Sequence, residues 1–134
     1  ITKDMVRKWK EKFSYVVGDN RECMVDLSVD GKNQTVDIGD LIREGCLKIV
    51  PLVGNAIKRI IATADPEYQP VLRNNIILSG GGSGIEGIAE VMAGEIADIG
   101  DVTVTCVEEP VERVAAGALI LAQDMPDDEY TAIN

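Results

Sequence analysis

The sequence predicts an α/β fold in which helices flank a sheet and a β-hairpin with a long helix forms a small additional part. After residue 65, short apolar runs typical of strands alternate with segments of helical periodicity, in the order strand, helix, strand, helix. Strands separated by helices pair in parallel through right-handed crossovers. The chain has 134 residues, 46% of them apolar, which is enough to build the core of one domain.

The first element is predicted to be an amphipathic helix that starts after Thr2 and reaches Val17. Thr2 is a suitable N-cap, and Gly18 can end the helix. Between them, apolar residues recur at steps of three and four: Met5, Val6, Trp9, Phe13 and Val16 or Val17.

A hairpin and a long helix are predicted next. Residues 23–29 and 34–38 have the composition of strands, and the stretch Asp30-Gly31-Lys32-Asn33 between them supplies a turn. Residues 37–40 offer caps for a helix that keeps its apolar period to about residue 64. Pro51 lies inside this helix and is expected to bend it, while the apolar face is expected to be core.

The second half of the chain is predicted to alternate between strands and helices. A turn-rich connection at 65–70 leads to a buried strand at 75–79, a helix at 85–96, a strand at 102–107 and a small-residue helix at 111–122. The last stretch, DMPDDEYTAIN, is acidic and aperiodic, so we expect it to fray.

Composition excludes several classes of function. The net charge is −10, so nucleic acid and anionic membranes are unfavourable partners. No histidine is present, which removes Ser-His and Cys-His nucleophiles and histidine-containing metal sites. No run of eighteen apolar residues predicts membrane insertion. Three separated cysteines in apolar segments are expected to be reduced core residues of a cytoplasmic protein: Cys23, Cys46 and Cys106.

One stretch concentrates glycine in an unusual way. Residues 74–90 read NNIILSGGGSGIEGIAE, a strand-like run followed by glycines and then by a helical pattern. Gly82 to Gly87 matches G-x-G-x-x-G, and Glu108 or Glu109 follows about twenty residues later, as in dinucleotide-binding units. However, Gly80 and Gly81 intervene after the strand, and the unit comes late in the chain. A tight strand-to-helix turn without a ligand is the structural alternative.

Three segments resemble the actin superfamily. WKEKFSYV, residues 9–16, resembles the actin helix in which a Lys-Glu pair flanks the adenine and ribose. The glycine stretch resembles the strand, glycine turn and helix on the other side of that nucleoside, and VTVTCVEEPVERVAAGALILA, residues 102–122, resembles the closing strand and helix. The GGGSG form and the hairpin containing Asp-Gly-Lys look more like the bacterial filament proteins of the MreB and MamK type, and the first helix favours the magnetosome-filament group.

This resemblance implies that the chain is the C-terminal part, subdomains IIA and IIB, of a bacterial actin-like ATPase with a ribonuclease H-like fold. We expect residues 1–134 to form a single fragment, which also begins without an initiator methionine. Residues 19–64 would form the hairpin and long-helix portion, 65–123 the portion with the glycine loop, and 124–134 an acidic tail.

The resemblance also implies a nucleotide site, with ATP as the cofactor and Mg²⁺ held mainly by another part of the protein. Lys10 and Glu11 would flank the adenine and ribose, although both could simply lie on a solvated helix face. Glycines would lie under the nucleoside and a serine and glycine would close the turn: Gly80, Gly81, Gly82, Ser83 and Gly84. The acidic start of the last helix, with Glu112 and Arg113, is expected to be a solvated surface.

The function implied is filament formation by self-association, with magnetosome positioning as one possible role. The fragment alone is not expected to hydrolyse ATP, because its Asp-x-Gly at Asp37-Ile38-Gly39 lacks the Gly-Thr run of a phosphate hairpin. Half a cleft would expose apolar surface and favour self-association. Two alternatives stay open: a stand-alone association module without a nucleotide role, and a dinucleotide-binding enzyme domain.

Overall fold

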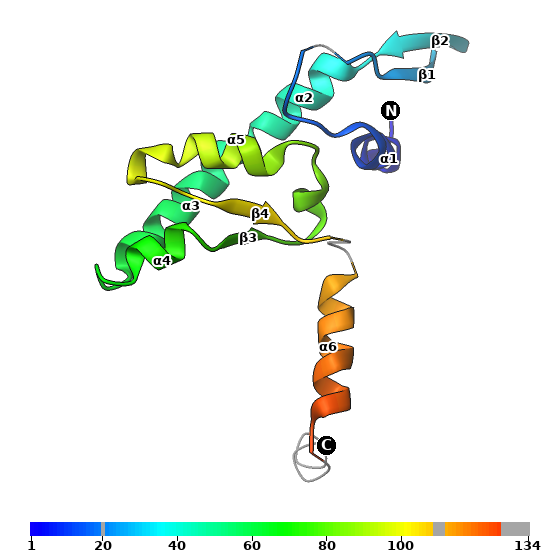
Figure 1. Ribbon diagram of the computed structural model, residues 1–134. Coiled ribbons are helices and arrows are strands. Elements are labelled where there is room, and N and C mark those ends of the chain that lie inside the picture. The colour runs from blue at the N-terminus through cyan, green and yellow to red at the C-terminus, as the bar shows by residue number, and fades with distance from the viewer. Residues whose placement is uncertain (20, 109–111, 127–134) are drawn as a thin grey trace.

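The computed structural model describes residues 1–19, 21–108 and 112–126. It confirms the predicted α/β class: helices flank two small sheets, an antiparallel hairpin and a parallel pair of strands (Figure 1). The hairpin and the first helix lie at one end of a long helical segment, and the parallel strands lie beside its other half.

Helix α1 spans Lys3–Phe13 and starts as predicted, since the backbone N–H of Met5 donates to Oγ1 of Thr2 at 3.3 Å. The predicted end near Val17 is wrong, because the chain becomes extended at Ser14. There it pairs with the other half of the molecule: the N–H of Val16 donates to the carbonyl oxygen of Glu86 at 2.9 Å. This long-range pairing replaces the last turn of the predicted helix.

Strands β1 (Met24–Val29) and β2 (Lys32–Asp37) form the predicted antiparallel hairpin. Val29 pairs with Lys32, so the turn is two residues rather than four. Asp30 and Gly31 both have positive φ, 51° and 76°, which is the requirement of the Asp-Gly type I′ turn.

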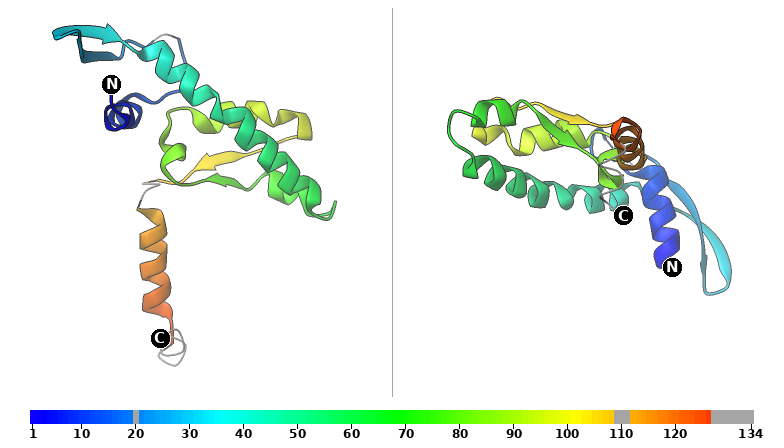
Figure 2. Two further views of the ribbon diagram at one scale, coloured as in Figure 1. Left: turned by 180° about the vertical axis from the view of Figure 1, so that it is seen from behind. Right: turned by 90° about the horizontal axis from the view of Figure 1, so that it is seen from below.

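The predicted long helix is divided into α2 (Gly39–Leu47) and α3 (Ile49–Thr63), which follow one another along the molecule (Figure 2). The break lies at Lys48, three residues before the proline expected to bend the helix. Pro51 has no N–H to donate to Leu47, and its ring crowds that carbonyl, so the interruption falls one turn earlier.

The second half begins with a short helix, α4 (Gln69–Arg73), which was not predicted and which starts near the end of the predicted turn-rich connection at 65–70. Strands β3 (Ile76–Leu78) and β4 (Val104–Cys106) then pair in parallel, as predicted. Between them, the chain forms a 3₁₀ turn, η1 (Gly81–Gly84), helix α5 (Ile88–Glu95) and a second 3₁₀ turn, η2 (Ala97–Ile99).

Only one face of the parallel pair is covered in the part of the chain that is described. Figure 2, seen from below, shows the strands as one layer, α5 beside them and α3 beyond. On the other face, Ile77 of β3 is 65% exposed. Cys106 is also exposed, which corrects its assignment to the core, whereas Cys23 and Cys46 are buried free thiols as predicted.

Helix α6 (Arg113–Asp124) follows β4 and confirms the predicted C-terminal helix. It has no buried residue and extends away from the rest of the molecule (Figure 1). Most of the predicted acidic tail, residues 127–134, lies outside the described residues.

Two clusters of buried side chains hold the elements together. The larger joins the long helical segment to the glycine stretch and α5: Val16, Cys46, Val50, Ile85, Ile88 and Met92. The smaller lies at the base of the hairpin: Tyr15, Cys23, Val25 and Ile38. The apolar face of α2 and α3 is core only in part, since Leu41 and Ile60 of the predicted face are exposed.

Candidate functional site

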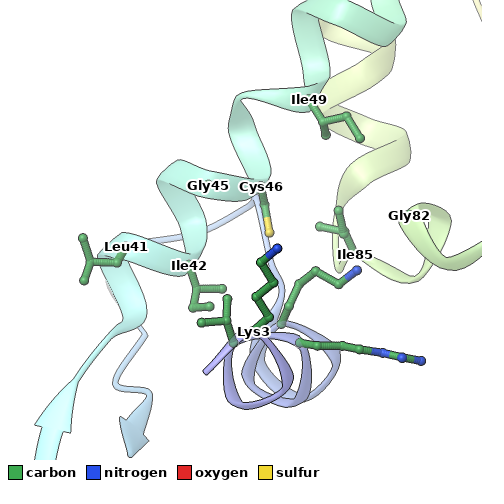
Figure 3. A pocket seen from close by; sticks show the side chains of 11 residues that line it. Lys3, Leu41, Ile42, Gly45, Cys46, Ile49, Gly82 and Ile85 are labelled. Carbon is green, nitrogen blue, oxygen red and sulfur yellow. The ribbon is translucent and has the colours of Figure 1, made fainter. Parts of the chain in front are cut away.

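Three elements that are distant in the sequence enclose a cleft of about 540 Å³, a volume typical of small-molecule sites. Helix α1 forms one wall, α2 and the first residue of α3 form a second, and the glycine loop forms the third (Figure 3). The cleft is therefore built by tertiary packing rather than by any one segment.

The walls of the cleft differ in character. From α2 and α3 come apolar side chains, among them Ile42, Cys46 and Ile49, and the glycine loop adds Ile85. Helix α1 contributes cations at steps of four and three residues: Lys3, Arg7 and Lys10. Because the chain carries a net charge of −10, this concentration of positive charge favours a ligand that has an apolar part and an anionic part.

The structure brings two of the sequence-predicted residues to the same cleft. Lys10 lines it from α1, and Gly82 lines it from the glycine loop. Glu11 does not line the cleft itself: its Oε1 accepts a hydrogen bond at 2.9 Å from Nε of Arg7, which does line it. The two residues predicted to flank the nucleoside therefore differ: Lys10 lines the cleft, whereas Glu11 is paired with Arg7.

The glycine loop is held by its own hydrogen bonds. The hydroxyl of Ser83 donates to the carbonyl oxygen of Gly80 at 2.8 Å, and the backbone N–H of Ser83 reaches the same oxygen at 3.0 Å. Ser83 is buried and lines a second cavity of about 190 Å³ between the loop and the core. The side chain of Ser83 thus closes the turn and leaves the cleft to the backbone of Gly82.

The glycines fall into two groups with different causes. Gly80 and Gly87 have φ values of +86° and +80°, where side chains are disfavoured. By contrast, a Cβ added at Gly81, Gly82 or Gly84 would meet no atom of the described structure within 4 Å. Packing and backbone conformation within this chain explain the first group but leave the bare backbone of the second unexplained.

The structure contradicts the dinucleotide-binding alternative. In that motif a helix begins within the glycine pattern, so that its N-terminus meets the phosphates. Here Gly82 to Gly84 form a 3₁₀ turn, and α5 begins only at Ile88, after the last glycine. The side chain of Glu108 accepts from Arg113 at 3.4 Å on an exposed surface, as expected for a solvated helix start, while Glu109 lies outside the described residues.

Sequence reasoning missed a group behind the cleft. The guanidinium of Arg21 donates two hydrogen bonds to the carboxylate of Glu86, at 2.7 and 2.6 Å, and lies 4.9 Å from the ring centroid of the buried Tyr15. The hydrogen bond from Arg21 lowers the pKa of Glu86. Nothing in one sequence signals a pair separated by 65 positions.

Other chemistry finds no support at the cleft. Burial raises the pKa of the Cys46 thiol, which therefore stays protonated at neutral pH and is a poor nucleophile.

Among the described residues, no group of three or more Cys, Asp or Glu could hold a metal ion. No helix in the same part of the chain is long and apolar enough to cross a membrane.

Comparison with known proteins identifies the family. The model of the MreB/Mbl protein family matches residues 5–129. The chain belongs to the MreB/Mbl family. This confirms the resemblance predicted from the first helix, the glycine stretch and the closing segment.

Relatives of this MreB/Mbl chain include actin-like proteins named MamK. It is 32% identical over 117 residues to the actin-like protein MamK of Paramagnetospirillum magneticum AMB-1 and 31% identical to that of Magnetospirillum gryphiswaldense MSR-1. Each alignment covers 87% of this chain, but only 34% and 32% of the relative. The chain therefore spans about a third of the length of these curated relatives.

Solved structures confirm the actin-like fold for this MreB/Mbl chain. A MamK double helical filament superposes with a TM-score of 0.87 at 29% identity, covering 94% of this chain and 39% of the other. A non-polymerising MamK mutant bound to AMPPNP gives 0.83 at the same identity, covering 92% and 38%.

Proposed function

We propose that this chain supplies the nucleoside-facing half of the ATP cleft in a filament-forming actin-like ATPase. The family, the AMPPNP bound to one solved relative and the filament formed by another support this proposal. Because the chain spans about a third of its relatives, the opposite half of the cleft would come from the remainder of the intact protein.

The observation that carries the proposal is the meeting of Lys10 and Gly82 across one cleft. An apolar wall with Ile42 and Ile49 suits a purine, and the open backbone at Gly81 and Gly82 lets a flat ligand approach without a side chain in the way. We place the adenine and ribose between α1 and the glycine loop, with Gly80 to Gly84 forming the shelf.

Glu11 has a conditional role in this proposal. Its carboxylate would accept hydrogen bonds from ribose hydroxyls, but it now accepts from Arg7. That ion pair is exposed on both sides, 73% for the Arg7 side chain and 55% for Glu11, so it contributes little and can exchange for a ligand.

Hydrolysis would require residues that this chain does not supply. Phosphoryl transfer needs Mg²⁺, phosphate-binding backbone and a positioned water. The carboxylate of Asp37, in the Asp-x-Gly at residues 37–39, already accepts hydrogen bonds from the N–H groups of Cys23 at 2.8 Å and Gly39 at 2.9 Å at the start of α2. We therefore assign ATP binding to the intact protein, with Mg²⁺ held mainly outside residues 1–134.

We also propose how the chain is divided into subdomains and what the intact protein assembles into. We assign residues 19–64 to the small subdomain with the hairpin and 65–123 to the larger subdomain with the glycine loop, and propose that the intact protein self-associates into filaments. Because the relatives are MamK proteins, the resemblance to the magnetosome-filament group favours a role in positioning magnetosomes.

The test replaces a glycine that only a ligand would need. In the intact protein, Gly82→Val should fold normally, because a Cβ there meets nothing within 4 Å, yet it should weaken binding of a fluorescent ATP analogue at least about tenfold by filling the shelf. Gly94→Val on the exposed side of α5 is the matched control and should leave binding unchanged. Glu11→Ala should weaken binding by about 1–2 kcal/mol through loss of ribose hydrogen bonds.

Two outcomes would contradict the proposal in different ways. Unchanged affinity of Gly82→Val, with binding by the unsubstituted protein intact, would refute the placement of the nucleoside. If the intact protein binds no nucleotide but still forms filaments that sediment, the association-module alternative would be favoured.

A further inference from the structure

Arg21 lies where the three walls of the cleft are joined, although it does not line the cleft. Its guanidinium binds Glu86 through two hydrogen bonds of 2.7 and 2.6 Å, one to each carboxylate oxygen. Glu86 comes directly after the glycine loop, so this bidentate contact anchors the end of that loop. Two parallel N–H···O bonds fix orientation as well as distance.

The same residue contacts the exit of α1. Its backbone N–H donates to the hydroxyl of Tyr15 at 3.2 Å, and its guanidinium lies 4.9 Å from the centroid of that ring. Tyr15 is fully buried, and its neighbours join the backbone of Glu86: Val16 donates to the Glu86 oxygen at 2.9 Å and Glu86 donates to the Ser14 oxygen at 3.2 Å. The helix that carries Lys10 is thus tied to the loop that carries Gly82.

A third contact reaches α2. The carbonyl of Arg21 lies against Gly39, the first residue of α2, so closely that a Cβ at Gly39 would overlap it. Asp37 completes this joint, because its carboxylate accepts from the N–H groups of Cys23 and Gly39. All three walls of the cleft therefore meet around one residue.

We propose that Arg21 and Glu86 are positioning residues that set the spacing of the cleft walls and thereby its nucleotide affinity, without touching the nucleotide. This inference rests on the proposed function of the cleft. The side chains of the pair are 45% and 56% exposed, so the pair adds little to global stability. Its effect is instead local, because it holds α1, α2 and the glycine loop in one arrangement before the ligand arrives.

The experiment compares the pair with another ion pair of similar length. In the intact protein, Arg21→Gln and Glu86→Gln are measured beside Lys58→Gln, which removes the 2.7 Å bond between Lys58 of α3 and Asp98 of η2, away from the cleft. Affinity for a fluorescent ATP analogue is determined well below the melting temperature of each variant. Arg21→Gln and Glu86→Gln should bind about two- to fivefold more weakly. Lys58→Gln should bind as the unsubstituted protein does.

Two further readouts separate positioning from a merely structural role. The exchanged pair, Arg21→Glu with Glu86→Arg, should recover part of the lost affinity, because an ion pair is restored across the same joint. Hydrogen exchange at the amide of Val16, which bonds to Glu86, should accelerate in both single variants without nucleotide present.

The outcomes separate a failure of this inference from a failure of the proposed function on which it rests. Unchanged affinity in both single variants, or a lower melting temperature without weaker binding, would overturn the positioning role. An intact protein that binds no ATP analogue would refute the proposed function and the affinity effect together. In that case, unchanged exchange at Val16 would also refute the positioning of the walls.

Discussion

Gly87 and Val17 lie so close that a Cβ on the glycine would overlap both methyl groups of the valine. Gly87 also has a φ of +80° and serves as the N-cap residue of α5. Two independent constraints, space and backbone conformation, therefore require glycine at the point where the loop meets the exit of α1.

Replacing Gly87 with alanine should destabilise the protein. Positive φ and overlap with Val17 together predict a loss of about 2–4 kcal/mol in the free energy of unfolding. Denaturant titration of the intact protein measures it. Gly81→Ala is the matched control, because its Cβ would meet nothing within 4 Å, and it should change stability by less than about 0.5 kcal/mol. Equal free energies of unfolding for Gly87→Ala and Gly81→Ala would show that the contact between Gly87 and Val17 accommodates a Cβ, and would contradict this prediction.

A pair of methionines tests the larger core cluster. Met92 on α5 is 1% exposed and packs in that cluster, whereas Met24 on β1 is 54% exposed. Met92→Ala should cost about 2–5 kcal/mol because it removes buried apolar surface and leaves a cavity. Met24→Ala should cost less than about 1 kcal/mol by the same measurement. Similar losses at both positions would contradict the assigned core.

The hydrogen bonds to Asp37 predict that the stability of the protein depends on pH. Hydrogen bonds from the N–H groups of Cys23 and Gly39 lower the pKa of its carboxyl in the folded state. A lowered folded-state pKa means that the unfolded state takes up the proton first, so the stabilisation is present above the ordinary Asp pKa of about 3.9 and is lost as the pH falls through and below it.

The measurement is the melting temperature between pH 7 and pH 3. Asp37→Asn should show a smaller loss of stability on acidification than the unsubstituted protein, because the amide oxygen cannot be protonated in this range. Asp65→Asn, at an exposed carboxylate after α3, is the control and should leave the pH profile nearly unchanged. Parallel profiles for Asp37→Asn and the unsubstituted protein would refute the linkage.

Helix α6 predicts how the 134-residue chain behaves by itself. Four of its large apolar residues are 59% to 74% exposed: Val114, Leu119, Ile120 and Leu121. Burying these apolar side chains against a second copy of the chain lowers the free energy, so the chain should self-associate. Replacing both Leu119 and Ile120 with serine should weaken association at least about tenfold, since each buried side chain of this size contributes about 1.5–3 kcal/mol.

Sedimentation velocity over a range of concentrations checks this expectation. Tyr68→Ser, at an exposed side chain between α3 and α4, is the control and should associate like the unsubstituted chain. A monodisperse monomer before any substitution would contradict the prediction, as would equal association after both replacements in α6.

Local sequence determined the elements whose causes lie within a few residues of one another. The hydroxyl of Thr2 caps α1, and Asp30-Gly31 forms a two-residue turn because only such residues accept positive φ at both positions. The alternation of strands with helices correctly predicted parallel pairing of β3 with β4. The resemblance of the first helix and the glycine stretch to a known family was confirmed by the family match.

Tertiary structure alone decided where those elements stop and which residues meet. Helix α1 ends at Phe13 because Ser14 and Val16 bond to Glu86, and the two sides of that contact are separated by about half of the chain. Gly81 and Gly87 belong to the same glycine-rich stretch of the sequence, yet only contacts show that Gly87 is required by Val17 and that Gly81 is open. Periodicity and turn preferences act between neighbours, whereas the pair of Arg21 with Glu86 depends on the folded path of the backbone, which no local pattern encodes.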